Sequence, residues 1–438
     1  MRVGYPRKHM SKLCIKGGRV IDPANAIDSV MDVLLERGKV TLVEKEINCQ
    51  GVQTLDASGL IVSPGLVDMH VHLREPGRED EETIVSGTRA AARGGFTSLA
   101  CMPNTNPVID TASVVEMILE KSGEEGIVNV FPVAAITKGQ DGVELTEMSD
   151  LVKAGVVGFS DDGQSVMNAR IMRRAFEYNK MFEKPLILHE EDANLSAGGQ
   201  INEGYYSTIL GLRGVPAVAE EVMVARDLNL AELTKGRIHI THISTSGSAD
   251  LVRAAKKKGI RVTCDVTPHH LTLTDEALSN YDTNCKVNPP LRTNEDISAL
   301  KEGLKDGTID AIASDHAPHA RHEKEKEFIY APFGLIGLET TLPLILTKLV
   351  ATDDLSLPEA ISKLTHEPAQ VLGVSKGTLS KDADADILIF EYQAKVKVDI
   401  EQFESKSRNC PFDGWELQGA VKYVFVGGKM VVKDGEVV

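Results

Sequence analysis

The sequence has 438 residues, of which 42% are hydrophobic and 26% charged, a composition that excludes a disordered or fibrous chain. Its 48 basic and 64 acidic residues give a net charge of −16, which argues against nucleic acid and anionic membrane surfaces as partners. The apolar runs fall far short of the about 20 residues that cross a bilayer. The six cysteines have no close pair, and no secretion signal precedes them, so we expect reduced thiols in a water-soluble, cytoplasmic protein.

Both ends of the chain contain short β-type runs separated by glycine-containing turns. These runs are 13–16, 32–35 and 40–43 near the N-terminus, and 386–390, 422–426 and 430–432 near the C-terminus. Short β-type runs joined by glycine-containing turns predict β-hairpins. Neither end is long enough to bury a good core alone, so we expect residues 1–60 and 373–438 to pair into one small β domain. Residues 1–10 are expected to be a loose tail.

The middle of the chain, residues 61–372, alternates apolar β-type runs with helical patterns. Eight runs have this apolar character: 60–72, 96–104, 128–137, 156–162, 185–191, 238–245, 261–270 and 309–319. Helical patterns separate them at 81–93, 112–121, 169–179, 218–228, 249–258 and 295–303. Eight such units predict an α/β fold, a (β/α)8 TIM-like barrel. A doubly wound sheet is the alternative, but it usually carries a glycine-rich phosphate loop after its first strand, and the sequence has none.

Histidines and aspartates follow the ends of several of these runs. In a barrel the carboxyl ends of the strands meet at one rim, which is where active sites lie. His70 and His72 are two residues apart on a strand and therefore share a face. Imidazole and carboxylate ligands without cysteine suit zinc. More ligands are available than one tetrahedral shell needs, so one or two zinc ions fit the sequence and two are favoured. The candidate ligands are His70, His72, His189, His242 and Asp315, together with one of the neighbours Asp161 and Asp162.

The motifs that carry these residues resemble those of dihydroorotase, in its bacterial form, within the amidohydrolase superfamily. The matching segments, in the family's order from about residue 12 onward, are GLVDMHVHLREPG, CMPNTNP, FSDDG, LHEE, HIST, VTPHHL, NPPLR, SDHAPH and APFG. Dihydroorotase interconverts N-carbamoyl-L-aspartate and L-dihydroorotate in de novo pyrimidine biosynthesis. The resemblance therefore implies a zinc-dependent cyclic amide hydrolase with a barrel fold.

The resemblance also assigns roles at the rim. His70 and His72 would bind one zinc ion, and His189 and His242 a second. Asp162 would bridge the two ions, and Asp315 would contact the first ion and shuttle protons for a metal-bound hydroxide nucleophile.

The fourth run departs from much of the superfamily. Many relatives bridge the metals there with a carboxylated lysine, but this run reads VGFSDD and has no lysine. In the form that this sequence resembles, an aspartate takes that place. Motif alignment favours Asp162 over Asp161, and neighbouring strand residues face opposite ways, so only one of the two can serve.

For the substrate, the resemblance implies a pairing between Arg74 and a carboxylate, a task that suits the planar guanidinium group. The full implied set is His72, Arg74, Asn104, Asn288, His319, Phe333 and Gly334, the last two through their backbone. The stretch 317–334 is densely charged, which predicts an exposed loop or helix turn; a mobile flap over the barrel mouth is the alternative.

Two other functions are open at this stage. One is another cyclic amidohydrolase, such as a hydantoinase or allantoinase, but the absent lysine and the pair of Arg74 and Asn104 favour an acidic substrate. The other is a non-catalytic, dihydroorotase-like subunit that supports aspartate transcarbamoylase, but such a protein loses metal ligands and this sequence keeps each one. The expected partner is the small-molecule substrate, and a homodimer or a complex with aspartate transcarbamoylase is compatible with activity.

Overall fold

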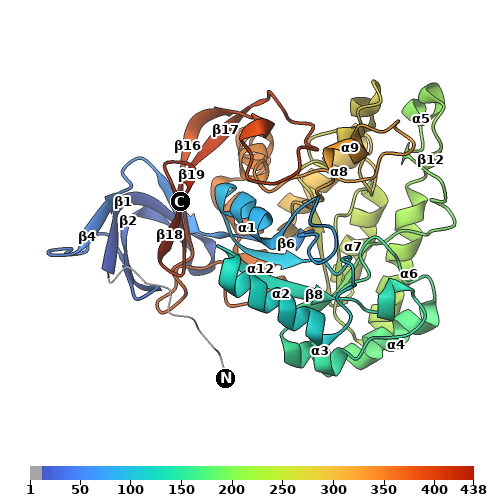
Figure 1. Cartoon of the computed structure of the whole chain (residues 1–438), viewed down its shortest axis with the longest axis horizontal. Helices are drawn as coiled ribbons and strands as arrows, with labels where there is room; N and C mark the ends of the chain where they lie inside the picture. Colours follow the sequence, from blue (N-terminus) through green and yellow to red (C-terminus); the bar gives the residue numbers. More distant parts are fainter. Residues whose placement is uncertain (1–11) are drawn as a thin grey trace.

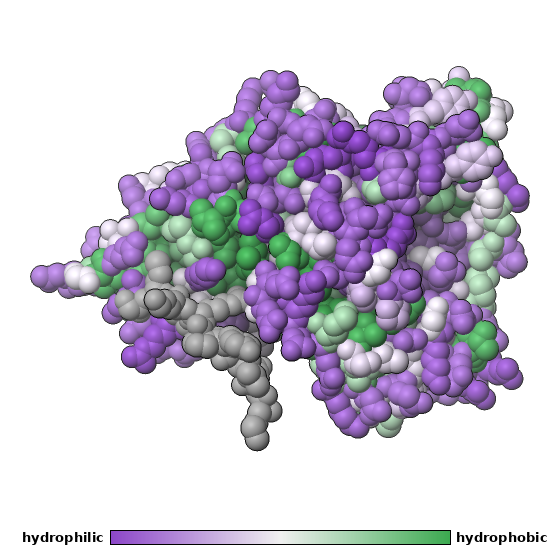
Figure 2. All heavy atoms as spheres, in the orientation of Figure 1, coloured by the Kyte–Doolittle hydropathy of each residue, from purple (hydrophilic) through white to green (hydrophobic). Residues whose placement is uncertain are grey.

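The structure is a computed structural model that describes residues 12–438, so the expected tail at 1–10 lies outside the described residues. Figure 1 shows a β sheet on one side of the molecule and a barrel of strands and helices on the other. Figure 2 shows that hydrophilic residues cover most of the face drawn. Among the described residues, no helix is both long and apolar enough to span a membrane.

The two ends of the chain pair into one β domain, as the sequence predicts, and in the structure this domain is a nine-stranded sheet. Its order is β19-β18-β17-β16-β5-β1-β2-β3, and β4 pairs with β1. Strands β5 and β16 join the two ends as an antiparallel pair. The strands are β1 Lys12–Asp22, β2 Ile27–Glu36, β3 Lys39–Glu44, β4 Gln53–Asp56, β5 Ile61–Pro64, β16 Ile387–Lys397, β17 Glu416–Val426, β18 Lys429–Lys433 and β19 Glu436–Val437.

The middle of the chain forms a nearly closed barrel of eight parallel strands in sequential order. A parallel bridge between Val71 and His316 joins the first strand to the chain that follows the last. Each of the eight predicted runs contains one barrel strand, which confirms the predicted fold. The strands are β6 Leu66–Val71, β7 Phe96–Cys101, β8 Asn129–Ala134, β9 Gly158–Phe159, β10 Leu186–Leu188, β13 Ile238–Ile240, β14 Val262–Val266 and β15 Ala311–Ile312.

Helices follow the barrel strands and cover the outside of the barrel. Their buried faces and the strands share one large apolar core. Threonine or asparagine side chains cap several helix N-termini; Thr83 and Thr293, for example, accept from backbone N–H groups of α1 and α8. The helices are α1 Ile84–Arg93, α2 Ala112–Glu125, α3 Met148–Ala154, α4 Ala169–Asn179, α5 Tyr205–Leu210, α6 Val218–Thr234, α7 Ser246–Lys257, α8 Asn294–Lys305, α9 Arg321–Lys324, α10 Thr341–Ile345, α11 Leu357–Leu364 and α12 His366–Leu372. A short strand pair, β11 Ile201–Asn202 and β12 Gly214–Val215, flanks α5.

The run 60–72 differs from its prediction as one barrel strand. It is divided at Gly65 into β5, which belongs to the sheet, and β6, which belongs to the barrel. A Cβ atom at Gly65 would lie 2.1 Å from Thr97 Cγ2, so only glycine lets the chain pass so close to β7. The chain thus moves from one layer to the other without a loop, a change that a continuous apolar pattern does not reveal.

The expectation of six reduced cysteines is wrong for two of them. Cys14 and Cys49 form a disulfide in the structure, and the other four cysteines are free and buried. The pairing of β4 with β1 places Thr54 opposite Cys14, which brings the chain just before β4 close to β1. The two cysteines are 35 positions apart, so their sequence spacing gave no indication of a pair.

The chain between β16 and β17 leaves the sheet and packs against the barrel. There the side chain of Glu339, which is 4% exposed, accepts hydrogen bonds from the backbone N–H groups of Glu404 and Ser405. Burial raises the pKa of Glu339 to about 8, against the effect of those donors and of nearby Arg93. A glutamate at this contact is therefore costly to ionise.

Replacing Glu339 with glutamine is expected to make stability less sensitive to pH. In the wild type the folded-state pKa is raised above the ordinary value of 4.5, so stability is lost as the pH rises from about 4.5 to about 8. Relative to the variant, the loss should reach up to about 1.4 kcal/mol per pH unit. Urea unfolding between about pH 4.5 and pH 8 measures this free energy of unfolding for the wild type and the variant. Glu416→Gln, at an exposed position, is the control. Parallel curves for wild type and Glu339→Gln would contradict the assignment.

Candidate metal centre and active site

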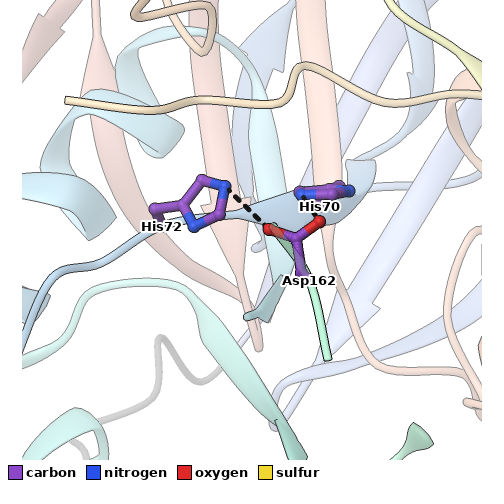
Figure 3. A group of neighbouring side chains, drawn as sticks. All are labelled: His70, His72 and Asp162. Carbon is purple, nitrogen blue, oxygen red and sulfur yellow. Dashed lines mark ion pairs between the residues drawn. The ribbon is translucent and has the colours of Figure 1, made fainter. Parts of the chain in front are cut away.

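Six predicted metal-binding side chains meet at the carboxyl end of the barrel. His70 belongs to β6 and His72 follows it, while the other four residues lie just beyond strands β9, β10, β13 and β15. Each of the six residues is at most 8% exposed. Figure 3 shows His70 and His72 on either side of the Asp162 carboxylate, to which both rings point. The shared barrel rim therefore brings together residues that are far apart in the sequence.

Asp162 lies at the centre of this cluster. Its Oδ1 atom is 3.4 Å from His70 Nε2 and its Oδ2 atom is 3.6 Å from His72 Nε2. On its other side, Oδ1 is 3.7 Å from His242 Nε2 and 3.9 Å from His189 Nδ1. Asp162 therefore takes part in two groups of three potential ligands, one with His70 and His72 and one with His189 and His242.

Asp315 approaches the first of these groups. Its Oδ1 atom is 3.2 Å from His72 Nε2 and 3.4 Å from His70 Nε2. Burial opposes ionisation of Asp315, but the neighbouring histidines prevail and lower its pKa. The opposite effect holds for His70: burial disfavours its charge, yet Asp162 and Asp315 raise the pKa of His70 to about 10. The carboxylates therefore stay ionised and make the site strongly attractive to cations.

Asp161 points away from the cluster. Its carboxylate accepts hydrogen bonds from the backbone N–H groups of Ile136 and Thr137 and from the Thr137 hydroxyl. Burial raises the pKa of Asp161 to about 6. Because adjacent residues face opposite ways, the chain places only Asp162 among the histidines, where the motif alignment expects it.

Side chains outside the cluster hydrogen-bond to three of the histidines and orient them. His70 Nδ1 lies 2.7 Å from Thr241 Oγ1, and His72 Nδ1 lies 2.8 Å from Asn104 Oδ1. His189 Nε2 lies 3.1 Å from Glu191 Oε2. These contacts occupy the ring nitrogens that face away from Asp162, and so they fix which nitrogen each histidine presents to the centre.

Three of the predicted site residues have backbone angles that residues other than glycine rarely adopt. The φ values are +61° at Arg74, +37° at His242 and +47° at Asp315. Such conformations cost free energy and persist only where the surrounding structure enforces them. Here they turn the chain sharply at the ends of β6, β13 and β15, which directs all three side chains toward the barrel mouth.

Beside the cluster lies a cavity of about 340 Å³, a size typical of small-molecule sites. Asp162, His189, His242 and Asp315 form one part of its wall. The rest of the wall contains the entire predicted substrate set, namely His72, Arg74, Asn104, Asn288, His319, Phe333 and Gly334.

The cation of the cavity wall is Arg74, and His319 lies beside it, where burial and the charge of Arg74 lower the pKa of His319 to about 3. A terminal nitrogen of Arg74 is 3.4 Å from His319 Nε2, and Arg74 Nε donates to the backbone oxygen of Pro318. Glu81, which is fully buried, contacts both residues: its Oε2 is 3.0 Å from Arg74 Nε and its Oε1 is 2.9 Å from His319 Nδ1. The buried carboxylate holds the two side chains next to each other.

The stretch 317–334 is exposed only in part. It contains the short helix α9, and Arg321 and His322 are exposed as predicted. Lys324 is buried instead and donates hydrogen bonds to the backbone oxygens of Pro332 and Gly334. Burial lowers the pKa of Lys324 to about 7. This lysine ties α9 to the far end of the same stretch; whether the stretch also moves as a flap stays a prediction.

Sequence reasoning missed several residues that support the site. Thr241 and Glu81 are clear examples, since each contacts predicted site residues directly. Thr241 immediately precedes His242 in the HIST motif, so its place beside the site had a sequence signal. Glu81 lies in a run of acidic residues at 79–82 that looks like solvated surface, and nothing in that run distinguishes the two buried members, Glu81 and Glu82, from the two exposed ones.

The residues present fit a zinc centre. His70 Nε2 and Asp162 Oδ1 are fully buried yet have no hydrogen-bond partner within the described chain, which is unusual for polar atoms. Two ligands of a tetrahedral zinc ion lie roughly 3.4 Å apart, since each is about 2.1 Å from the metal. The contacts of Asp162 with His70 and His72 are close to that separation. Histidine and carboxylate are also the donors that zinc accepts.

Solved structures of cyclic amidohydrolases share this fold. An L-hydantoinase from Arthrobacter aurescens superposes with a TM-score of 0.88 at 27% identity, covering 98% of each chain. A dihydropyrimidinase from Brevibacillus agri superposes with a TM-score of 0.86 at 22% identity, covering 98% of this chain and 96% of the other. At such low identity the second likeness shows the fold alone.

Sequence comparisons are more specific. The family model described as dihydro-orotase-like matches residues 59–248, and the amidohydrolase family model matches residues 215–438. A dihydroorotase from Pelotomaculum thermopropionicum is 55% identical, covering 97% of this chain and 99% of that protein. A dihydroorotase from Geobacter metallireducens is 52% identical, covering 96% of this chain and 99% of that protein. The chain therefore belongs to the dihydroorotase family of cyclic amidohydrolases.

Proposed function

We propose that this cyclic amidohydrolase interconverts N-carbamoyl-L-aspartate and L-dihydroorotate at the cavity beside Asp162, in the pyrimidine pathway. The observation that carries the proposal is the wall of this one cavity, which joins a histidine–aspartate cluster suited to zinc with the buried cation Arg74 and the neighbouring His319. L-Dihydroorotate has a ring amide and a carboxylate substituent, so its site needs both parts. The metal cluster would bind the reacting amide, and the Arg74 side of the cavity would bind the negatively charged carboxylate. Hydantoinase and allantoinase activities are less well supported, since the family relatives at 50–55% identity are dihydroorotases.

In this proposal His70, His72, His189, His242 and Asp162 hold zinc, and the two groups of ligands suggest two ions, with an aspartate where related enzymes use carboxylated lysine. Bound zinc would supply Lewis-acid polarisation of the amide carbonyl and activation of water. Asp315 lines the cavity and contacts the same two histidines as Asp162, so it takes the proton from the attacking water and delivers it to the ring nitrogen as the ring opens. Ring closure reverses these steps.

The remaining wall residues bind and orient the substrate. Arg74 pairs with its carboxylate through the terminal guanidinium nitrogens, since Arg74 Nε is already engaged by Pro318 and Glu81. Asn104 and His319 lie on the same wall and complete the carboxylate site. Asn288 and the backbone of Phe333 and Gly334 also line the cavity and hold the ring. Because the metal ligands line the same cavity, these contacts place the amide beside them.

Replacing Arg74 with alanine is expected to raise KM for both substrates about 100-fold and to change kcat far less. Two charge-assisted hydrogen bonds to the substrate are lost, while the reacting groups stay in place. Steady-state assays of the zinc-loaded enzyme in both directions, with hydantoin and allantoin as alternative substrates, measure this.

Arg173→Ala is the matched control, because Arg173 pairs with Glu177 on the exposed face of α4. It should behave as the wild type. If the zinc-loaded wild type failed to interconvert the two compounds, the proposed function would be wrong. If it did so and Arg74→Ala kept a normal KM, only the role of Arg74 would be wrong.

The proposal places the enzyme in the cytoplasm, where the other enzymes of pyrimidine synthesis would use its product. We also propose that the active chain forms a homodimer and associates with aspartate transcarbamoylase. Light scattering of the purified chain, alone and mixed with aspartate transcarbamoylase, distinguishes a monomer, a dimer and a mixed complex.

A further inference from the structure

The segment between β16 and β17 contributes side chains to the rim of the barrel, although it belongs to the C-terminal part of the sheet. We call residues 405–410 the rim segment. Within it, the Ser405 hydroxyl donates to a carboxylate oxygen of Glu82, and the Ser407 hydroxyl donates to the backbone oxygen of Glu81. These contacts fix the segment beside the loop that carries Arg74. The next buried residue along the segment is Asn409, which is 3% exposed.

The side-chain amide of Asn409 spans two pieces of the cavity wall. Its Oδ1 atom accepts a hydrogen bond from the backbone N–H of His319 at 3.2 Å. Its Nδ2 atom donates to the backbone oxygens of Ala317 at 2.9 Å and Gly334 at 3.1 Å. The backbone oxygen of Asn409 accepts from Ile336 N–H at 3.0 Å. One residue thereby links the chain at 317–319 to the chain at 334–336.

The chemistry of this link needs an amide. The site requires one acceptor and two donors on a short side chain, and asparagine is the residue of that size that provides them. The three backbone groups are buried. Loss of the amide would leave the His319 N–H and the Ala317 oxygen without a partner, whereas the Gly334 oxygen would keep its bond from Lys324. The two linked pieces are also tightly packed: a Cβ atom at Gly334 would lie 2.8 Å from Ala317 Cβ.

The linked groups are the ones that face the cavity. Ala317, His319 and Gly334 all line it, and His319 Nε2 lies 2.8 Å from the backbone oxygen of Phe333 across the same gap. We propose that Asn409 is a positioning residue for substrate binding, acting through the backbone of His319 and Gly334. This inference rests on the proposed function, because it takes that wall as the substrate site. It also makes the C-terminal β region a part of the active site rather than a separate support.

Asn409→Ala tests the proposal in the zinc-loaded full-length enzyme. We expect KM to rise about tenfold in both directions, because the wall is displaced, while kcat stays within about twofold, because the proton carrier and metal ligands are untouched. A residue that only stabilised the fold would lower the thermal midpoint and leave KM unchanged.

Asn179→Ala is the matched control. Asn179 is equally buried, at 3% exposed, and donates to the backbone oxygen of Lys184 at 2.6 Å, but it lies at the end of α4 on the outside of the barrel. It should lower the thermal midpoint and keep the KM of the wild type. A normal KM in Asn409→Ala alongside an active wild type would overturn the inference. An inactive wild type would overturn the proposed function and this inference with it.

A measurement on the wild type covers the case in which Asn409→Ala does not fold. Hydrogen exchange of the zinc-loaded enzyme is compared with and without a saturating equilibrium mixture of carbamoyl aspartate and dihydroorotate. We expect substrate to slow exchange in the rim segment together with residues 331–336. Slower exchange at 331–336 with no change in the rim segment would overturn the inference.

Discussion

Asp315→Asn should lower kcat by about 10³-fold in both directions while leaving the zinc content of the protein unchanged. Asparagine keeps the shape of the side chain, but it cannot take a proton from water or return one to the ring nitrogen. The wild-type carboxylate is already ionised across the working range, because its histidine neighbours lower the pKa of Asp315 against the effect of burial. Steady-state rates and metal analysis on the same preparation measure both outcomes.

Asp310→Asn is the control for this experiment. Asp310 precedes β15, at the opposite end of the strand from Asp315, where it pairs with Lys256 at 2.7 Å. Its replacement should cost some stability and little kcat. An Asp315→Asn enzyme with zinc bound and near-normal kcat would show that another group carries the proton.

Asp162→Ala is expected to remove zinc from both ligand groups and to reduce activity by more than about 100-fold, since even the loss of an outer partner of a metal ligand costs 10- to about 100-fold. The reason is geometric: Asp162 is the one residue that the two groups share. His189→Ala disrupts only the second group and should retain zinc at the first. Zinc per chain, measured by atomic emission after dialysis, separates these results.

Asp161→Asn is the matched control, because it changes the neighbouring carboxylate, which binds the backbone at Ile136 and Thr137 and not the cluster. It should retain zinc and activity. Two zinc ions per chain in Asp162→Ala would contradict the central place given to that residue, and loss of zinc in Asp161→Asn would show that the two aspartates were assigned the wrong way round.

The barrel could be predicted from the sequence because each of its strands is buried on both faces. Such strands read as continuous apolar runs, and the helices between them have a clear period, so α4 begins and ends where the pattern predicts. The site residues followed from the same pattern, since His70, His189 and Asp315 stand at or just beyond strand ends. Their convergence needed only the rule that parallel strands in a barrel end at one rim.

Other features depend on contacts between distant parts of the chain, which no local pattern records. The disulfide between Cys14 and Cys49 depends on the pairing of β4 with β1. Glu81 and Asn409 also depend on such distant contacts. Glu81 lies in an acidic run and Asn409 in an irregular segment, and each supports the site only because the fold places His319 beside it. The choice between Asp161 and Asp162 needed a motif alignment, because composition alone treats the two alike.

The pairing of β5 with β16 has a consequence for how the chain is made. About 300 residues separate the two strands, so on the ribosome β5 emerges with one edge paired to β1 and the other edge open. At typical elongation rates of 5–20 residues per second, that edge stays open for roughly 15 to 60 seconds. An open strand edge invites pairing with another chain. The N-terminal strands of this protein therefore keep an unpaired edge exposed to other chains throughout the synthesis of the barrel.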